Sequence, residues 1–231
     1  MKTLFAGCSF LANLQKHLPR SNQRQILSSS GSGNQAIAAR VAHQIAQQKY
    51  NQVVVLWSGV NRLDFPVPTA LHQTWKKPDW IACCEVGDAT WYHSGGMVGS
   101  GLTDSVPQPV RQWFQQQYLG CNINSKYLSE LTLTAIANTQ AILEQQDIDY
   151  HMGFIYNVDQ GSIGTPHEAS HGALDRTLPI SKLINWKKFT TQTAPYEWCS
   201  DRNWLDDDNY HPTAFGMINW FREQMNIDIV P

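Results

Sequence analysis

The sequence predicts a three-layer α/β/α fold whose central sheet is doubly wound and mainly parallel. Segments of strand character alternate along the chain with segments of helical period, which is typical of this architecture. Residues 52–57 contain a continuous apolar run, as expected for a strand buried on both faces of a parallel sheet. The 231 residues suffice for one sizeable core, so we expect a single domain over residues 1–231.

The chain opens with a predicted strand, a tight turn and a helix. Residues 2–6 have strand character and enter Gly7-Cys8-Ser9, and apolar residues follow at 10–12 before Pro19 breaks the helix. A serine placed there lies between the carboxyl end of a strand and the amino end of a helix. Free N–H groups and the helix dipole stabilise a developing negative charge at such a point. The position therefore suits a nucleophile, although a serine after a glycine is also an ordinary helix N-cap.

The next elements continue the alternation. Residues 25–29 are predicted to form a second strand, and the turn at 31–34 leads into an amphipathic helix. Apolar residues recur in that helix at every fourth position, namely Ile37, Val41 and Ile45. The glycines of the turn let backbone N–H groups approach a ligand closely. The apolar strand at 52–57 follows this helix.

Two segments interrupt the alternation in the second half. Residues 62–110 hold five prolines, three tryptophans and a glycine-rich tract, so we expect a long irregular insertion that walls the substrate cleft. Helices are predicted over 110–119 and 124–145, and a strand over 149–156. A long loop at about 157–205 then precedes the final helix.

Charge and cysteine content exclude several classes of protein. The formal net charge is −2, so we expect neither nucleic acid nor a membrane surface as a partner. The five cysteines include the adjacent pair Cys83-Cys84, which indicates reduced thiols. Because no apolar run approaches about 18 residues and no signal peptide is recognisable, we expect a cytoplasmic protein.

A carboxylate and an imidazole lie close together near the carboxyl terminus. Asp208 precedes His211 by three residues, and Pro212 suits the first position of a helix that runs through Phe221. A hydroxyl becomes a good nucleophile when a base takes its proton, and a carboxylate fixes the tautomer of that base. Ser9, His211 and Asp208 can supply these three roles.

Four short motifs in this order resemble those of the SGNH (GDSL-type) hydrolase family. Gly7-Cys8-Ser9 is similar to the first motif, Gly-Asp-Ser, and Asp208-Asn-Tyr-His211 is similar to the last, Asp-x-x-His. Between them lie a glycine motif at residues 30–34 and Gly59-Val60-Asn61. The resemblance implies a flavodoxin-like hydrolase fold with Ser9 as nucleophile.

The resemblance also implies an oxyanion hole with three donors, each placed after a predicted strand. The donors are the N–H of Ser9, the N–H of either Gly31 or Gly33, and the side-chain amide of Asn61. Spacing does not decide between the two glycines. The carboxyl ends of parallel strands meet at one edge of a sheet, so all these groups should gather there.

The motifs depart from the family pattern at two positions. Cys8 replaces the usual aspartate of the first motif, and Arg62 stands where the Gly-x-Asn-Asp pattern ends in aspartate. Variants that open with Gly-Cys-Ser-Phe are similar to hydrolase-like proteins of phages and their bacterial hosts, so a phage-encoded chain of this kind would associate with a virion or host cell. Arg62 would either clamp an anionic substrate group or pair with Asp64.

Aromatic residues point toward the substrate class. The chain has nine tryptophans, many of them in Gly/Pro-rich segments, where rings stack on sugars or anchor long loops. We expect Trp57, Trp91 and Arg62 to contact substrate. Together these features predict a serine esterase that acts on a small-molecule or glycan ester, preferably an O-acetyl group on a carbohydrate, without a cofactor.

Two other functions fit parts of the sequence. One is a non-catalytic glycan-binding or virion-associated module on the same fold. The other is a zinc-dependent hydrolase, because His167-Glu168-Ala-Ser-His171 matches the His-Glu-x-x-His pattern. Gly172 follows this pattern at once and no third ligand is obvious beyond Glu197 and Asp175, which favours a capped surface helix and no metal. The sequence leaves the oligomeric state open.

Overall fold

The computed structural model describes residues 1–19, 21–29, 31–60, 62–72, 83–93, 108, 112, 125–158, 172–190, 193–208 and 210–229. Its centre is a four-stranded parallel sheet with strand order β2-β1-β3-β7. The strands are β1 (Thr3–Gly7), β2 (Arg24–Ser28), β3 (Gln52–Trp57) and β7 (Asp149–Phe154). The predicted fold class is confirmed.

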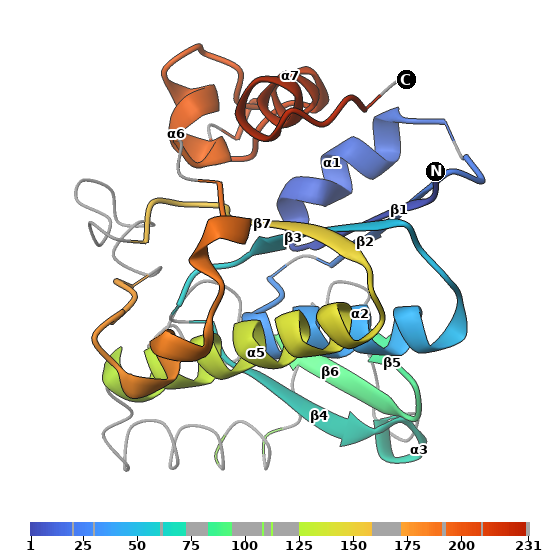
Figure 1. Ribbon diagram of the computed structural model, residues 1–231, viewed down its shortest axis with the longest axis vertical. Coiled ribbons are helices and arrows are strands. Elements are labelled where there is room, and N and C mark those ends of the chain that lie inside the picture. Colours follow the sequence, from blue (N-terminus) through green and yellow to red (C-terminus); the bar gives the residue numbers. More distant parts are fainter. Residues whose placement is uncertain are drawn as a thin grey trace.

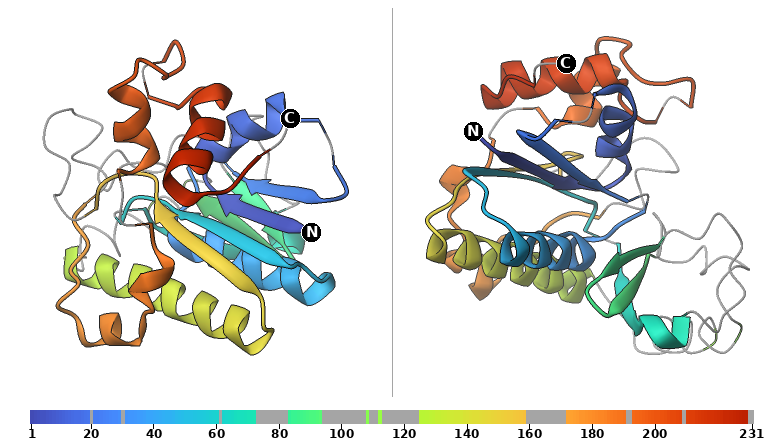
Figure 2. Two further views of the ribbon diagram at one scale, coloured as in Figure 1. Left: turned by 45° about the horizontal axis from the view of Figure 1, so that its top comes forward. Right: turned by 90° about the vertical axis from the view of Figure 1, so that its right-hand side faces the viewer.

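Helices cover both faces of this sheet. On one face lie α1 (Ser9–His17), α6 (Pro195–Ser200) and α7 (Ala214–Met225); on the other lie α2 (Asn34–Gln47) and α5 (Ser125–Gln145) (Figures 1 and 2). The chain winds from β1 outward to β2 through α1, then returns through α2 to β3 on the other side of β1. The carboxyl ends of β1 and β3 therefore flank the point where the strand order reverses, which is where ligands bind in such sheets.

The apolar side chains of β3 pack into the hydrophobic cores on both faces of the sheet. Val53, Val55 and Trp57 point into the core beneath α2 and α5, whereas Val54 and Leu56 point into the core beneath α1 and α7. Side chains of a strand alternate between the two faces, so a strand covered by helices on both sides must be apolar at every position. This explains why the sequence pattern identified β3 reliably.

The described parts of the insertion after β3 form regular elements, where the sequence predicted irregular structure. It contains β4 (Asp64–Pro68), the short helix α3 (Thr69–His72), β5 (Cys83–Val86) and β6 (Ala89–His93), and the strands form an antiparallel sheet in the order β4-β6-β5. The two prolines of β4 are tolerated because β4 is an edge strand of this sheet. Gly87, with φ of +60°, begins the two-residue turn that joins β5 to β6. The second sheet lies beyond α2, on the side away from α1 and α7 (Figure 2).

The long segment before the final helix also contains short elements. These are the 3₁₀ helices η2 (Pro179–Leu183) and η3 (Trp186–Lys188), followed by α6. The final helix begins at Ala214, not at Pro212 as predicted, because Thr213 is its N-cap and accepts a hydrogen bond from Gly216 N at 3.0 Å. Pro212 instead forms a β-bridge with Leu205.

Parts of the prediction fall outside the described residues. The helix expected over 110–119 is one of them, apart from residue 112. In the part of the chain that the structure describes, no helix combines the length and the apolar character needed to cross a membrane. Cys8, Cys84 and Cys199 are free thiols.

Candidate functional site

A continuous chain of hydrogen bonds joins three residues from the two ends of the polypeptide. Ser9 is the first residue of α1, two positions after the last residue of β1, and its Oγ lies 2.9 Å from His211 Nε2. The other ring nitrogen, Nδ1, lies 2.5 Å from Asp208 Oδ2. The structure thus brings together the three residues that the sequence analysis selected as nucleophile, base and orienting carboxylate.

Asp208 orients the turn as well as the imidazole. Its Oδ1 accepts hydrogen bonds from the backbone N–H groups of Tyr210 at 2.8 Å and His211 at 2.9 Å. Partial burial acts to raise the pKa of Asp208, but the hydrogen bonds from the His211 ring and from the two backbone N–H groups outweigh it, and the pKa lies below its ordinary value. A carboxylate that stays ionised in this position fixes Nδ1 as the protonated nitrogen and leaves Nε2 free to accept the Ser9 proton.

Asn13 connects the helix of Ser9 to the loop of His211. Its Nδ2 contacts Asp206 Oδ2 and donates to the carbonyl oxygen of Pro212 at 3.2 Å. The loop is closed on itself by a hydrogen bond of 2.7 Å from Asp206 N to His211 O. The sequence analysis did not select Asn13. The available signal was a polar residue four positions after Ser9, on the same side of α1.

Aromatic rings surround the imidazole. The Phe10 and Tyr210 rings meet the His211 ring edge to face, with centroid distances of 5.7 and 4.9 Å. Tyr156, just beyond β7, packs against Phe10 at 5.4 Å. Ser9 itself is 9% exposed. Ser9 is thus almost buried, whereas the side chains of His211 and Asp208 are 26% and 49% exposed.

The structure distinguishes the two glycines proposed as oxyanion donors. The N–H of Gly33 donates to Asp64 Oδ1 at 2.8 Å, and Asp64 Oδ2 accepts from Ala36 N at 2.9 Å, so this carboxylate caps α2. A Cβ on Gly33 would lie 2.8 Å from both Arg62 O and Asp64 Oδ2, so glycine is needed there for close packing. Gly31 has a φ of +70°.

The other two groups predicted to donate to the oxyanion are the Ser9 N–H and the side-chain amide of Asn61. Ser9 lies at N1 of α1, and the N-cap residue Cys8 makes no side-chain capping hydrogen bond. The N–H of Ser9 belongs to the first turn, which has no intrahelical acceptors. Asn61 lies outside the described residues.

One of the predicted substrate contacts, Trp57, needs correction. Trp57 is completely buried, and its Nε1 donates to Met152 Sδ at 3.4 Å. It faces the core beneath α2 and α5 because of its position in the alternation of β3, so it cannot touch substrate. Trp91 lies on β6 of the second sheet, opposite Pro66 and Cys84, where it is half-buried.

Arg62 neither pairs with Asp64 nor extends into solvent. It is 4% exposed, and its Nη1 and Nη2 lie 3.5 Å from Ser32 O and Tyr210 Oη. The expected pairing was wrong because Asp64 turns toward the first turn of α2.

A second buried arginine, Arg40, was not selected from the sequence. Its signal was a charged residue four positions after Ala36 in the buried stripe of α2.

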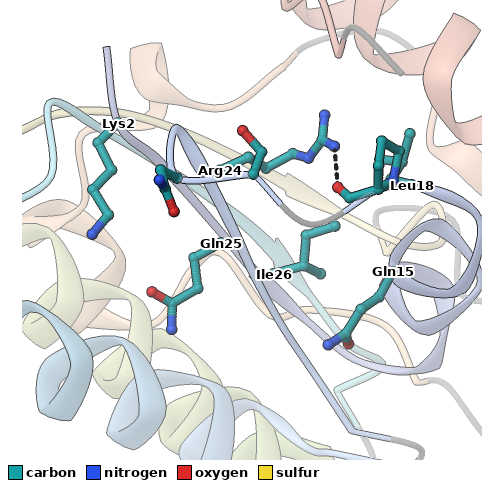
Figure 3. A pocket seen from close by; sticks show the side chains of 9 residues that line it. Lys2, Gln15, Leu18, Arg24, Gln25 and Ile26 are labelled. Atoms are coloured by element: carbon teal, nitrogen blue, oxygen red, sulfur yellow. Dashed lines mark hydrogen bonds between the residues drawn. The ribbon is translucent and has the colours of Figure 1, made fainter.

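Three cavities help to place the site. A cavity of about 660 Å³ lies by the amino ends of β1 and β2 and is lined by Lys2 and Arg24, among others (Figure 3). A second cavity, of about 810 Å³, is lined by Thr3 and Arg24, among others, at the same end of these strands, which is opposite to Ser9. A cavity of about 320 Å³ lies at the carboxyl end of β7 and is lined by Tyr156, Trp186 and Phe189, among others. Neither Ser9 nor His211 lines any of the three cavities, but Tyr156, which lines the smallest one, packs on Phe10 next to Ser9.

The described residues offer no cluster of metal ligands. Within the ranges that the structure describes, no group of three or more His, Cys, Asp or Glu residues is placed to hold a metal ion. The His167-Glu168-Ala-Ser-His171 segment lies outside those ranges.

Comparisons with known proteins give structural neighbours only. No protein-family model and no curated sequence matches the chain. Solved structures that resemble it include a tryptophan variant of Axe2, an acetyl xylan esterase from Geobacillus stearothermophilus, with a TM-score of 0.44 and 13% sequence identity. Axe2 itself matches with a TM-score of 0.43 and 12% identity. Each match covers 100% of this chain and 96% of the other.

Proposed function

We propose that this protein is a serine hydrolase that cleaves carboxylic esters. Ser9 is the nucleophile, His211 the general base and Asp208 the residue that orients and supports the base. The observation that carries the proposal is the hydrogen-bonded sequence from Ser9 Oγ to His211 Nε2 at 2.9 Å and from His211 Nδ1 to Asp208 Oδ2 at 2.5 Å. The distance from Ser9 Oγ to His211 Nε2 lies within the range of about 2.6–3.2 Å expected for a general base, and the contact between His211 Nδ1 and Asp208 Oδ2 is a short hydrogen bond that orients the ring.

The reaction proceeds in two halves. Ser9 Oγ attacks the ester carbonyl carbon while its proton passes to His211 Nε2, and the tetrahedral intermediate collapses when the C–O bond to the alcohol breaks and the alcohol takes that proton. Water then gives a proton to Nε2 and attacks the acyl-enzyme, and the carboxylic acid leaves as Ser9 regains its proton. The Asp208 carboxylate stabilises the imidazolium in both halves.

The oxyanion of each intermediate needs donors at the carboxyl end of β1. We assign this role to the N–H groups of Ser9 and Gly31, together with the side-chain amide of Asn61. Gly31 is preferred over Gly33 because the Gly33 N–H already donates to Asp64. One such donor contributes about 3 kcal/mol to lowering the barrier.

The preferred substrate is an O-acetyl ester of a carbohydrate. A small acyl group suits a serine that is 9% exposed beside the tightly packed rings of Phe10 and Tyr210. The cavity at the end of β7 offers a place for part of the alcohol, because the residues that line it include the aromatic Trp186 and the polar Asn157 and Thr193. Trp91 remains a candidate contact for a larger glycan.

The test is substitution of the nucleophile. Ser9→Ala should abolish hydrolysis of p-nitrophenyl acetate and of acetylated oligosaccharides, and it should abolish covalent labelling by a fluorophosphonate. Ser28→Ala is the matched control, since Ser28 ends the neighbouring strand β2 but its Oγ bonds to Gln15. Wild-type turnover by Ser9→Ala would refute the proposal. Absence of labelling in the wild type, together with tight polysaccharide binding, would support a non-catalytic glycan-binding module instead.

A further inference from the structure

Two arginines are buried beside the candidate site. Arg40 is 7% exposed and Arg62 is 4% exposed. Burying a guanidinium is costly unless it is paired with an opposite charge or fully hydrogen-bonded. Over the described part of the chain, no ion pair includes either arginine. The Nε of Arg62 is buried without any hydrogen-bond partner.

Both guanidinium groups hold the same residue. Arg40 Nη2 donates to Ser32 Oγ at 3.1 Å and to the carbonyl oxygen of Gly7 at 2.8 Å. Arg62 Nη1 approaches the carbonyl oxygen of Ser32 at 3.5 Å. Ser32 is fully buried between Gly31 and Gly33, and Gly7 ends the strand that leads to Ser9. The two charges therefore lie directly behind the backbone that carries the proposed oxyanion donors.

The described buried charges in this region do not balance. Asp64, at 6% exposure, interacts electrostatically with Arg40 and caps α2 through Gly33 and Ala36. One negative charge thus faces two positive charges. The other titratable groups that face Arg62 are the Cys8 thiol and the phenols of Tyr156 and Tyr210. Burial raises the pKa of Tyr156 far above its ordinary value, so this phenol stays neutral.

We propose that the Arg62 guanidinium, with Arg40 behind it, is a positioning and electrostatic residue that stabilises the oxyanion through the Gly31-Ser32-Gly33 turn. An unbalanced positive charge in a region of low dielectric favours a negative charge that develops nearby. The same contacts fix the turn before substrate binds. Arg62 has little access to solvent, so it acts through Ser32 and through its field. The inference rests on the proposed serine hydrolase activity.

Two substitutions separate charge from packing. Arg62→Met keeps most of the side-chain volume and removes the charge, so kcat for p-nitrophenyl acetate should fall about 10- to 100-fold while KM changes less than about twofold. Arg62→Lys keeps a charge that can be lost, because burial lowers the pKa of a lysine. The rate–pH profile of Arg62→Lys should therefore fall on the alkaline side. The wild type should show no such limb, since a guanidinium stays protonated.

The controls identify which idea fails. Rates are normalised to the fraction of molecules labelled by a fluorophosphonate, which removes the contribution of misfolded protein. A Ser9-dependent activity with wild-type kcat in Arg62→Met would overturn this inference and leave the proposed function intact. A pH profile for Arg62→Lys identical to that of the wild type would also overturn it, even if Arg62→Met does not fold. Activity that survives Ser9→Ala refutes the proposed function itself.

Discussion

The contacts of Asn13 lead to a prediction about how Ser9 and His211 are kept together. Ser9 and Asn13 lie on one helix, and Asn13 Nδ2 contacts both Asp206 Oδ2 and Pro212 O on the loop that carries His211. Asn13→Ala removes both contacts at once. We expect the variant to fold with its sheet intact and to lose alignment between the hydroxyl and the imidazole.

The magnitude follows from the two hydrogen bonds. A bond to a carboxylate contributes about 1.5–3 kcal/mol and one to a neutral carbonyl about 1 kcal/mol. Asn13 and Asp206 are only partly buried, so water replaces part of what is lost. We expect the free energy of unfolding to fall by about 1–3 kcal/mol. If about 1.4 kcal/mol of this loss comes from weaker docking of the His211 loop on α1, fewer molecules have Ser9 and His211 aligned, and kcat should drop about tenfold.

The assay compares three exchanges by steady-state hydrolysis of p-nitrophenyl acetate and by urea unfolding. Asn13→Asp places two carboxylates in contact and should be worse than Asn13→Ala. Combining Asn13→Asp with Asp206→Asn restores an amide opposite a carboxylate and should recover part of kcat. Gln15→Ala is the matched control, because Gln15 lies on the same helix but bonds to Ser28.

Three results would refute this reasoning. If Asn13→Ala and Asn13→Asp lose stability but keep wild-type kcat, the contact has no part in aligning the site. If the double exchange is no more active than Asn13→Asp alone, the amide and carboxylate are not direct partners. A fall in kcat for Gln15→Ala equal to that for Asn13→Ala would mean that α1 responds to any change.

Further predictions concern the carboxylate and the packing of α7. Asp208→Asn should lower kcat by about 10²- to 10⁴-fold in steady-state assays, because His211 loses the partner that fixes its tautomer. The pKa of Asp208 is lowered in the folded state, so its contribution to stability is present above the ordinary carboxyl pKa and is lost as pH falls through the lower folded value. Urea unfolding should accordingly show the wild type losing its advantage over Asp208→Asn below about pH 4, and a constant difference down to pH 2 would contradict this. Gly216→Ala should lower the free energy of unfolding by about 1–3 kcal/mol, since its Cβ would lie 2.9 Å from Cys199 Sγ. Adding Cys199→Ala should recover part of that loss in thermal unfolding, and no recovery would exclude this clash as the cause.

Local patterns predicted the elements that build the main sheet. The turn at Gly7-Cys8-Ser9 joins β1 to α1 as expected, and the unbroken apolar run became β3 with both faces covered. These predictions succeeded because each depends on neighbours within a few residues. The second sheet was missed because Pro66 and Pro68 indicate a break in the chain, and an edge strand tolerates them only when a partner such as β6 is present.

The sequence by itself determined the chemistry that Ser9, His211 and Asp208 can perform, because residue type and the three-residue spacing of Asp208 and His211 are local properties. Only the tertiary structure decided that Ser9 meets His211, since the two are 202 positions apart in the sequence and lie 2.9 Å apart at Oγ and Nε2. The tertiary structure also decided that Trp57 faces the core beneath α2 and α5. Both faces of β3 are apolar, so the sequence pattern does not tell which helices cover each face. The Gly33 N–H is occupied by Asp64, a side chain 31 positions away that no local pattern predicts.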